Sequence, residues 1–218
     1  MLDVTPRSAA RAAWAAAATN VAAALGMALL LMPGLPVEGS VLADRMAYVA
    51  LHPWRWGAGW LLWHGATIGL LAFYVGLAGQ WARRAPILCT LALLCATAGL
   101  GADLSAQSLT MSLAARLPPE GFAALEDGVG ALSGYLGNGL YTVAGILLTA
   151  AGARDLPRAL VVSSAVPWLA GLALSAAVLA RSPAGQVAST AVLFPTFVLW
   201  TVLVGRWLAT REPAERPV

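Results

Sequence analysis

The sequence predicts an all-α, polytopic integral membrane protein, a bundle of six transmembrane helices. Three observations carry this prediction. Of the 218 residues, 60% are hydrophobic and only 11% are charged, the mean hydropathy is +0.76, and six long apolar stretches follow one another. A soluble globular domain carries about 25% charged residues. This difference excludes a water-soluble globule, a nucleic-acid-binding module and a disordered tail.

Each apolar stretch is long enough to cross a bilayer, which takes about 20 mainly apolar residues. The stretches are 13–32, 56–80, 86–113, 122–151, 159–180 and 184–208. They are rich in Ala and Leu and lack the alternation of polar and apolar residues that a transmembrane β-barrel requires. The first is longer than the apolar core of a cleaved signal peptide. We therefore expect it to be a retained helix.

The boundaries of the first three stretches are marked by helix breakers and charges. The first stretch ends at 33–36 (Pro-Gly-Leu-Pro), and the second ends at 81–84 (Trp-Ala-Arg-Arg). The third begins at Pro86, and proline is favoured in the first turn of a helix. The later connections are short. Without a linker or a low-complexity tract, the sequence predicts one transmembrane domain over residues 1–218.

Residues 33–55 form the one longer loop, which we expect on the outer face of the membrane. Within it, Val41–Leu51 is predicted as a short helix at the membrane interface. The loop ends with aromatic residues interleaved with His52 and Arg55. Such residues usually anchor a helix at the level of the lipid headgroups. Contact with a ligand at the outer mouth of the bundle is the alternative for these two side chains.

The orientation follows from the arginines, since the chain has no lysine. Cytoplasmic loops of membrane proteins carry the excess of basic residues. One side of the predicted bundle holds nine arginines: Arg7, Arg11, Arg83, Arg84, Arg154, Arg158, Arg206, Arg211 and Arg216. The other side holds Arg45, Arg55, Arg116 and Arg181. We therefore expect both termini in the cytoplasm. The bias toward Arg and Ala indicates a bacterial chain, and hence the bacterial inner membrane.

Two ionisable residues at membrane depth need an explanation, because such groups are costly there and mark either a functional site or an internal pair. His64 and Asp103 lie at equal distances from the turn between the second and third stretches. Antiparallel helices joined by a tight turn bring such residues to the same depth. We expect the imidazole and the carboxylate to pair there, although equal depth does not determine whether they face each other.

Further polar residues lie close to this depth on the third and fourth stretches. The fourth stretch also carries glycines at intervals of three or four residues, which let a neighbouring backbone approach closely. The predicted ligand- or proton-binding cluster is His64, Asp103, Gln107, Tyr135, Asn138 and Tyr141. Its predicted outer mouth is His52, Arg55, Glu126 and Asp127. The alternative is that the cluster is internal packing only. Asn20, in the first stretch, is predicted to make an interhelical hydrogen bond.

The residue inventory argues against several kinds of chemistry. With only two histidines, at different depths, the chain cannot clamp a haem between two helices or build a histidine-rich di-iron site. Two cysteines provide no ligand set for zinc or an iron–sulfur cluster. A phosphate-binding loop with its lysine is excluded because lysine is absent. We expect no cofactor and no metal.

Three functions remain open. The leading hypothesis is a carrier or channel for a proton, an ion or a small polar solute, which uses the His64/Asp103 cluster. The second is a structural or accessory subunit of a larger membrane complex. The third is a membrane enzyme that acts on a lipid at the outer interface through Asp103, Glu126 and Asp127. Between an enzyme and a protein without catalytic activity, the sequence favours the latter. Expected partners are membrane lipids and other membrane subunits or a second copy, and not nucleic acid.

Overall fold

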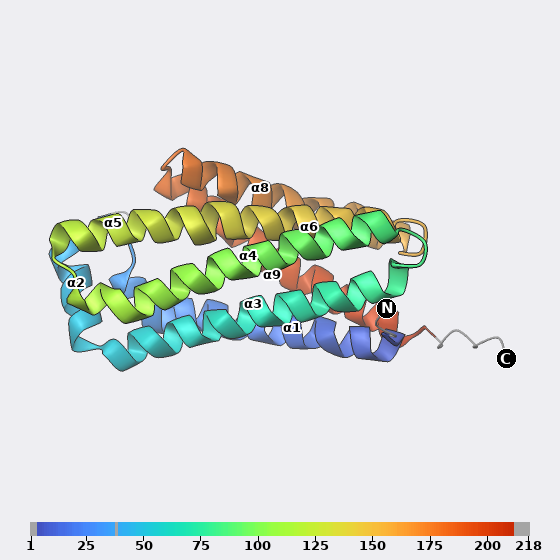
Figure 1. Ribbon diagram of the computed structural model, residues 1–218, viewed down its shortest axis with the longest axis horizontal. Coiled ribbons are helices and arrows are strands. Elements are labelled where there is room, and N and C mark those ends of the chain that lie inside the picture. Colours follow the sequence, from blue (N-terminus) through green and yellow to red (C-terminus); the bar gives the residue numbers. More distant parts are fainter. Residues whose placement is uncertain (1–3, 38, 212–218) are drawn as a thin grey trace.

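The computed structural model describes residues 4–37 and 39–211 and is helical throughout its length (Figure 1). Among these residues, six helical spans are long and apolar enough to cross a membrane, as predicted: Pro6–Gly34, Pro53–Trp81, Pro86–Arg116, Pro119–Gly152, Arg158–Leu179 and Pro183–Ala209. The elements are α1 (Pro6–Gly26), η1 (Met27–Leu31), η2 (Met32–Gly34), α2 (Leu42–Leu51), α3 (Pro53–Trp81), α4 (Pro86–Leu113), η3 (Ala114–Arg116), α5 (Pro119–Val129), η4 (Gly130–Gly137), α6 (Asn138–Gly152), α7 (Arg158–Ser163), α8 (Ala165–Leu179) and α9 (Pro183–Ala209).

Five of the α-helices begin with a proline in the first turn: α1, α3, α4, α5 and α9. The first turn needs no backbone donor from its own residues, so the missing N–H of proline costs nothing there. Thr5 and Ser182 add side-chain caps, since their hydroxyls accept from the backbone N–H of Ser8 and of Gly185, each at 3.2 Å. The first span therefore begins at Pro6, seven residues before the apolar stretch that predicted it.

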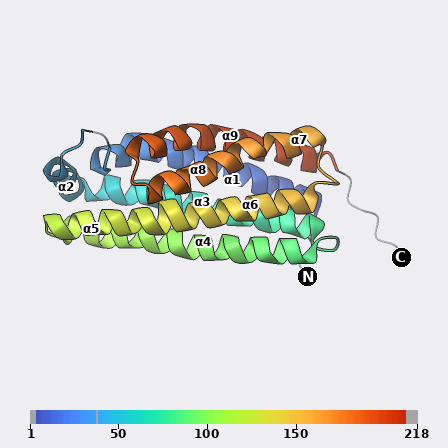
Figure 2. The ribbon, with the colours of Figure 1, turned by 90° about the horizontal axis from the view of Figure 1, so that it is seen from above.

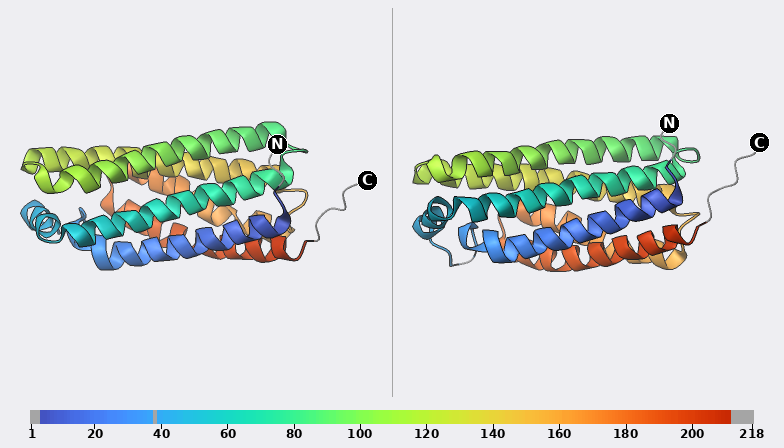
Figure 3. Two further views of the ribbon diagram at one scale, coloured as in Figure 1. Left: turned by 60° about the horizontal axis from the view of Figure 1, so that its bottom comes forward. Right: turned by 90° about the horizontal axis from the view of Figure 1, so that it is seen from below.

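The six spans form a closed ring, in chain order. Each packs against the spans before and after it, and α9 returns to pack against α1 (Figures 2 and 3). The ring has two distinct ends. The beginning of α1 and the end of α9 lie at one end, with the 82–85 and 153–157 turns, whereas α2 lies at the other (Figure 1). These are called the terminal end and the α2 end.

The predicted arginine asymmetry matches these two ends. Of the arginines expected on the cytoplasmic side, Arg216 lies outside the described residues, and the others belong to the segments at the terminal end. Arg45, Arg55, Arg116 and Arg181 belong to the α2 end.

The half of the ring near the terminal end is filled by a large core. Aromatic side chains from three spans meet there: Trp168 on α8 lies 5.1 Å from Trp200 on α9 between ring centroids, and Phe73 on α3 lies 5.8 Å from Trp200. Trp81 packs directly on the backbone of Gly152, where a Cβ would overlap its ring. This half is consequently closed by packing.

The helix expected over 41–51 is present as α2, and it packs across the other end of the bundle. A smaller core beneath it contains Leu31, Val49, Trp56 and Phe122. Arg45 of α2 is buried, and its guanidinium donates to Glu126 of α5. The longer loop is therefore fastened to the bundle through an ion pair as well as through apolar contacts.

Candidate functional site

A cavity of about 440 Å³ lies inside the ring, between the two cores. Pockets for small molecules are typically about 300–1,000 Å³. One side is bounded by the rings of Trp168 and Phe197, whose centroids are 6.2 Å apart, and the cavity extends toward the α2 end as far as Met32 and Thr190. Every span contributes to its lining; examples are Asn20, Trp63, Asp103, Asn138, Trp168 and Phe194.

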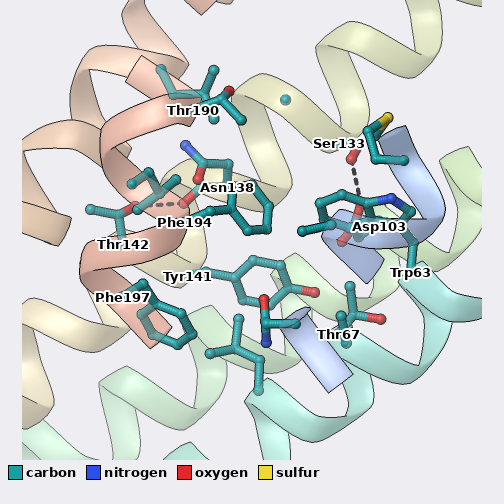
Figure 4. Close-up of a pocket in the computed structure, with 18 of the residues that line it drawn as sticks. Trp63, Thr67, Asp103, Ser133, Asn138, Tyr141, Thr142, Thr190, Phe194 and Phe197 are labelled. Carbon is teal, nitrogen blue, oxygen red and sulfur yellow. Dashed lines mark hydrogen bonds between the residues drawn. The ribbon is translucent and has the colours of Figure 1, made fainter. Parts of the chain in front are cut away.

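Asp103, in the middle of α4, is the single carboxylate among the described residues that line the cavity. Its side chain is buried, and the hydroxyl of Ser133 donates a hydrogen bond to it (Figure 4). Glycines bring these two residues together: a Cβ on Gly99 would lie 3.1 Å from the carbonyl oxygen of Gly137. Because neither glycine has a side chain, α4 and η4 approach closely at this depth.

Tyr141, on α6, has a hydroxyl with no hydrogen-bond partner. The residue is 8% exposed, and the oxygen itself is buried. In Figure 4 the hydroxyl points toward the side of the cavity where Asp103 and Thr67 lie. The Tyr141 backbone carbonyl, in contrast, accepts from the hydroxyl of Tyr74 at 3.0 Å, which joins α6 to α3 across the ring. Most buried polar groups are hydrogen-bonded, so an unpartnered hydroxyl beside a cavity is an exception that needs an explanation.

Asn138 lines the cavity but also joins α6 to α8. Its amide donates to the carbonyl oxygen of Gly171 at 2.7 Å and to Ser175 Oγ at 2.9 Å, and Ser175 donates onward to the Tyr135 carbonyl at 3.2 Å. The side chain of Tyr135 is 41% exposed and does not line the cavity, so only its backbone takes part in this network.

The structure places no hydrogen bond or ion pair between the described residues His64 and Asp103. His64 Nδ1 lies 3.0 Å from the Trp60 carbonyl oxygen of its own helix. The cavity face of α3 passes through Trp63 and Thr67. A helix turns about 100° per residue. His64 is thus rotated off that face and is absent from the lining.

Two other polar predictions differ from the structure. Gln107 lies one turn beyond Asp103 and is buried, but it does not line the cavity, and its Oε1 has no partner. Asn20 does line the cavity, yet its amide donates to the carbonyl of Ala16 at 2.8 Å in its own helix. The predicted interhelical hydrogen bond of Asn20 is therefore not formed through this donor.

None of the four residues predicted at the outer mouth lines the cavity. His52 packs on the ring of Tyr48, 5.0 Å between centroids, and Arg55 lies over the neighbouring Trp54, 5.4 Å from its centroid. The two carboxylates are paired with arginines: Glu126 with Arg45 at 2.7 Å, and Asp127 with Arg181 at 3.6 Å. All four residues thus make local contacts at the α2 end.

Four lining residues were not predicted from the sequence: Ser133, Thr67, Trp63 and Phe194. Ser133 could have been predicted, because it lies two residues before Tyr135, which was expected close to the depth of Asp103. The aromatic residues carried no signal, since apolar side chains at helical spacing are typical of every span.

Within residues 4–37 and 39–211, no group of three or more His, Cys, Asp or Glu side chains is placed to hold a metal ion. The chain matches none of the family models, curated proteins or solved structures with which it was compared. Its fold and its cavity therefore carry the functional argument alone.

Proposed function

We propose that this membrane protein is a carrier for a small solute, which binds in the central cavity at Asp103. The observation that supports this proposal most directly is that a buried carboxylate and the unpartnered hydroxyl of Tyr141 line the same cavity. Ionisable groups at membrane depth commonly mark solute or ion pathways.

A purely structural role accounts for only part of this arrangement. Asn138 makes two hydrogen bonds to α8, as an internal packing residue should. Among the described residues, Ser133 donates a hydrogen bond to Asp103 and the Gln107 side chain lies close to it, although a carboxylate accepts several hydrogen bonds. The Tyr141 hydroxyl has no hydrogen-bond partner within the described part of the chain. A bound solute would satisfy these two groups, whereas helix packing leaves them incomplete.

The packing around the cavity differs between the two ends of the bundle, as expected for one state of a carrier. The terminal half of the ring is packed, and the cavity extends toward the α2 end. From the arginine distribution, we place the α2 end outside a bacterial inner membrane and both termini in the cytoplasm. In that orientation, the cavity lies nearer the outside, beneath α2 and the smaller core, and transport would also require the packed terminal half to part.

Labelling of an engineered cysteine from each side of the membrane tests this proposal. In a background with Cys89 and Cys95 replaced by Ala, Thr67→Cys places one thiol in the cavity lining. Leu61→Cys, less than two turns away and 59% exposed on the outer surface of the bundle, is the control in lipid. Both variants are reconstituted into vesicles and treated with a membrane-impermeant thiol reagent, added to either side.

A carrier exposes its site alternately, so Thr67→Cys should react from both sides and Leu61→Cys from neither. Reaction of Thr67→Cys from one side only would contradict transport and leave a static binding site. No reaction from either side would mean that the cavity is inaccessible to water, and would overturn the proposal.

A further inference from the structure

We infer that the solute is a small organic cation: an ammonium group beside Asp103, attached to an apolar body that lies against aromatic rings. This inference rests on the proposed function and names the class of its substrate. The charge of the cavity is the first argument. Among the described residues, Asp103 is the single carboxylate that lines it, and the lining contains no Arg or His. The chain has no Lys.

An unpaired carboxylate in this environment favours a ligand of opposite charge. Burying a charge without a partner is costly, and pairing offsets that cost. An anionic solute would meet Asp103 with no basic group to compensate. A neutral solute would leave the carboxylate to take up a proton or remain unpaired. A cationic solute pairs with the carboxylate, so the cavity holds neither two like charges nor an unpaired one.

The walls of the cavity suit the rest of such a molecule. Trp63 on α3 and Phe194 on α9 meet edge to face, 5.2 Å between centroids, and both line the cavity (Figure 4). Aromatic faces attract cations, and they also pack well against apolar groups. The Tyr141 ring lies in the same cavity, next to Asp103, so charge and aromatic surface are presented together.

Acceptors for more than one ammonium hydrogen are also present. Asp103 has spare acceptor capacity beyond the bond from Ser133, and Tyr141 offers its unpartnered hydroxyl oxygen. A third acceptor comes from the kink in α9. Pro195 has no N–H, so the carbonyl of Ala191, four residues earlier, loses its usual helical donor, and both residues line the cavity.

Three ligands of similar shape and different charge test the inference. They are 2-phenylethylamine, which is cationic at pH 7, the neutral 2-phenylethanol and the anionic phenylacetate. Binding of each radiolabelled compound to the purified full-length protein is measured by equilibrium dialysis, for the wild type, Asp103→Asn and Asp155→Asn. Asp155 is the control carboxylate, because it pairs with the exposed Arg84 at the terminal end, away from the cavity.

We expect the amine to bind more tightly than the alcohol, and phenylacetate to bind weakest. A hydrogen bond to a charged group contributes about 1.5–3 kcal/mol, so Asp103→Asn should weaken amine binding roughly 10- to 100-fold. The same substitution should leave alcohol binding within a factor of about three, and Asp155→Asn should change neither.

The remaining outcomes separate this inference from the proposed function. If the alcohol binds as tightly as the amine, and Asp103→Asn has no effect on either, the cavity binds solutes but the cationic class is wrong. If none of the three binds, the inference is also overturned, and the thiol labelling of Thr67→Cys still decides whether the protein is a carrier. A loss of all binding in Asp103→Asn together with a lower Tm would indicate a structural role for the carboxylate instead.

Discussion

Replacing Glu126 by Gln should release α2 from the end of the bundle. Arg45 is 8% exposed, and two of its nitrogens donate to the two carboxylate oxygens of Glu126, Nε at 3.1 Å and Nη2 at 2.7 Å. This fork matches the carboxylate geometry and is among the stronger protein hydrogen-bond arrangements. A Gln side chain keeps one acceptor, loses the charge, and leaves the guanidinium buried. Charge-assisted hydrogen bonds contribute about 1.5–3 kcal/mol each, and we take one as lost.

The neighbouring residue is a matched control for this prediction. Asp127 lies 3.6 Å from Arg181, and the two side chains are 72% and 83% exposed. Such a surface pair contributes about 0–1 kcal/mol. In hydrogen–deuterium exchange, Glu126→Gln should therefore speed exchange of the α2 amides (Leu42–Leu51) roughly 10- to 100-fold, since every 1.4 kcal/mol is about tenfold. Asp127→Asn should leave them unchanged. Equal protection of α2 in the two variants would show that the buried pair does not hold this helix.

Three further substitutions test the packing and the site. Gly145→Ala should lower the thermal stability in detergent, because its Cβ would overlap the ring of Trp168, whereas Gly65→Ala, whose Cβ would meet open space, should not; equal losses would contradict this packing. Asn138→Ala removes two hydrogen bonds to α8 and should lower the free energy of unfolding by about 0.6–1.7 kcal/mol in a denaturant titration. An unchanged midpoint would show that these bonds do not stabilise the packing of α6 against α8. Tyr141→Phe removes an unpartnered hydroxyl, so Tm should stay the same or rise while the affinity for 2-phenylethylamine falls; a large drop in Tm would instead indicate a structural role.

The six spans were predictable because the bilayer imposes a simple length rule on apolar helices. The third predicted stretch, 86–113, coincides with α4, and the fifth and sixth differ from α7–α8 and α9 by a single residue at each end. The first was too short by seven residues at its start. Its Arg7 and Arg11 lowered the local hydropathy, although Pro6 and the Thr5 cap start a helix regardless of polarity.

The site was predicted in part, and the errors share one cause. Depth along a span follows from counting residues, and three of the predicted residues, Asp103, Asn138 and Tyr141, line the cavity. The facing of a side chain depends also on how each helix is rotated. All six spans are apolar on every side, so their amphipathic signal is weak and the sequence gives little information on that rotation. His64 and Tyr135 were predicted in the same cluster, and neither lines the cavity.

Three irregular parts of the bundle lie at the cavity, and this relates its architecture to the proposed transport. The π-helical segments η1 and η4 contribute Met27 and Ser133 to the lining, and Pro195 interrupts the hydrogen bonds of α9 beside them. Segments with an altered or missing i→i−4 bond are where helices bend, and π-helical turns are frequent at functional sites. The packed half near the terminal end is filled by the large core instead, and its one break in the described residues separates α7 from α8 at Ser164. A movement that opened the cavity toward the terminal end would therefore need the least free energy if α1, α6 and α9 bent at the cavity. The helical segments of the packed half would then move apart as rigid bodies. The same irregular segments would then both shape the binding site and permit it to change sides.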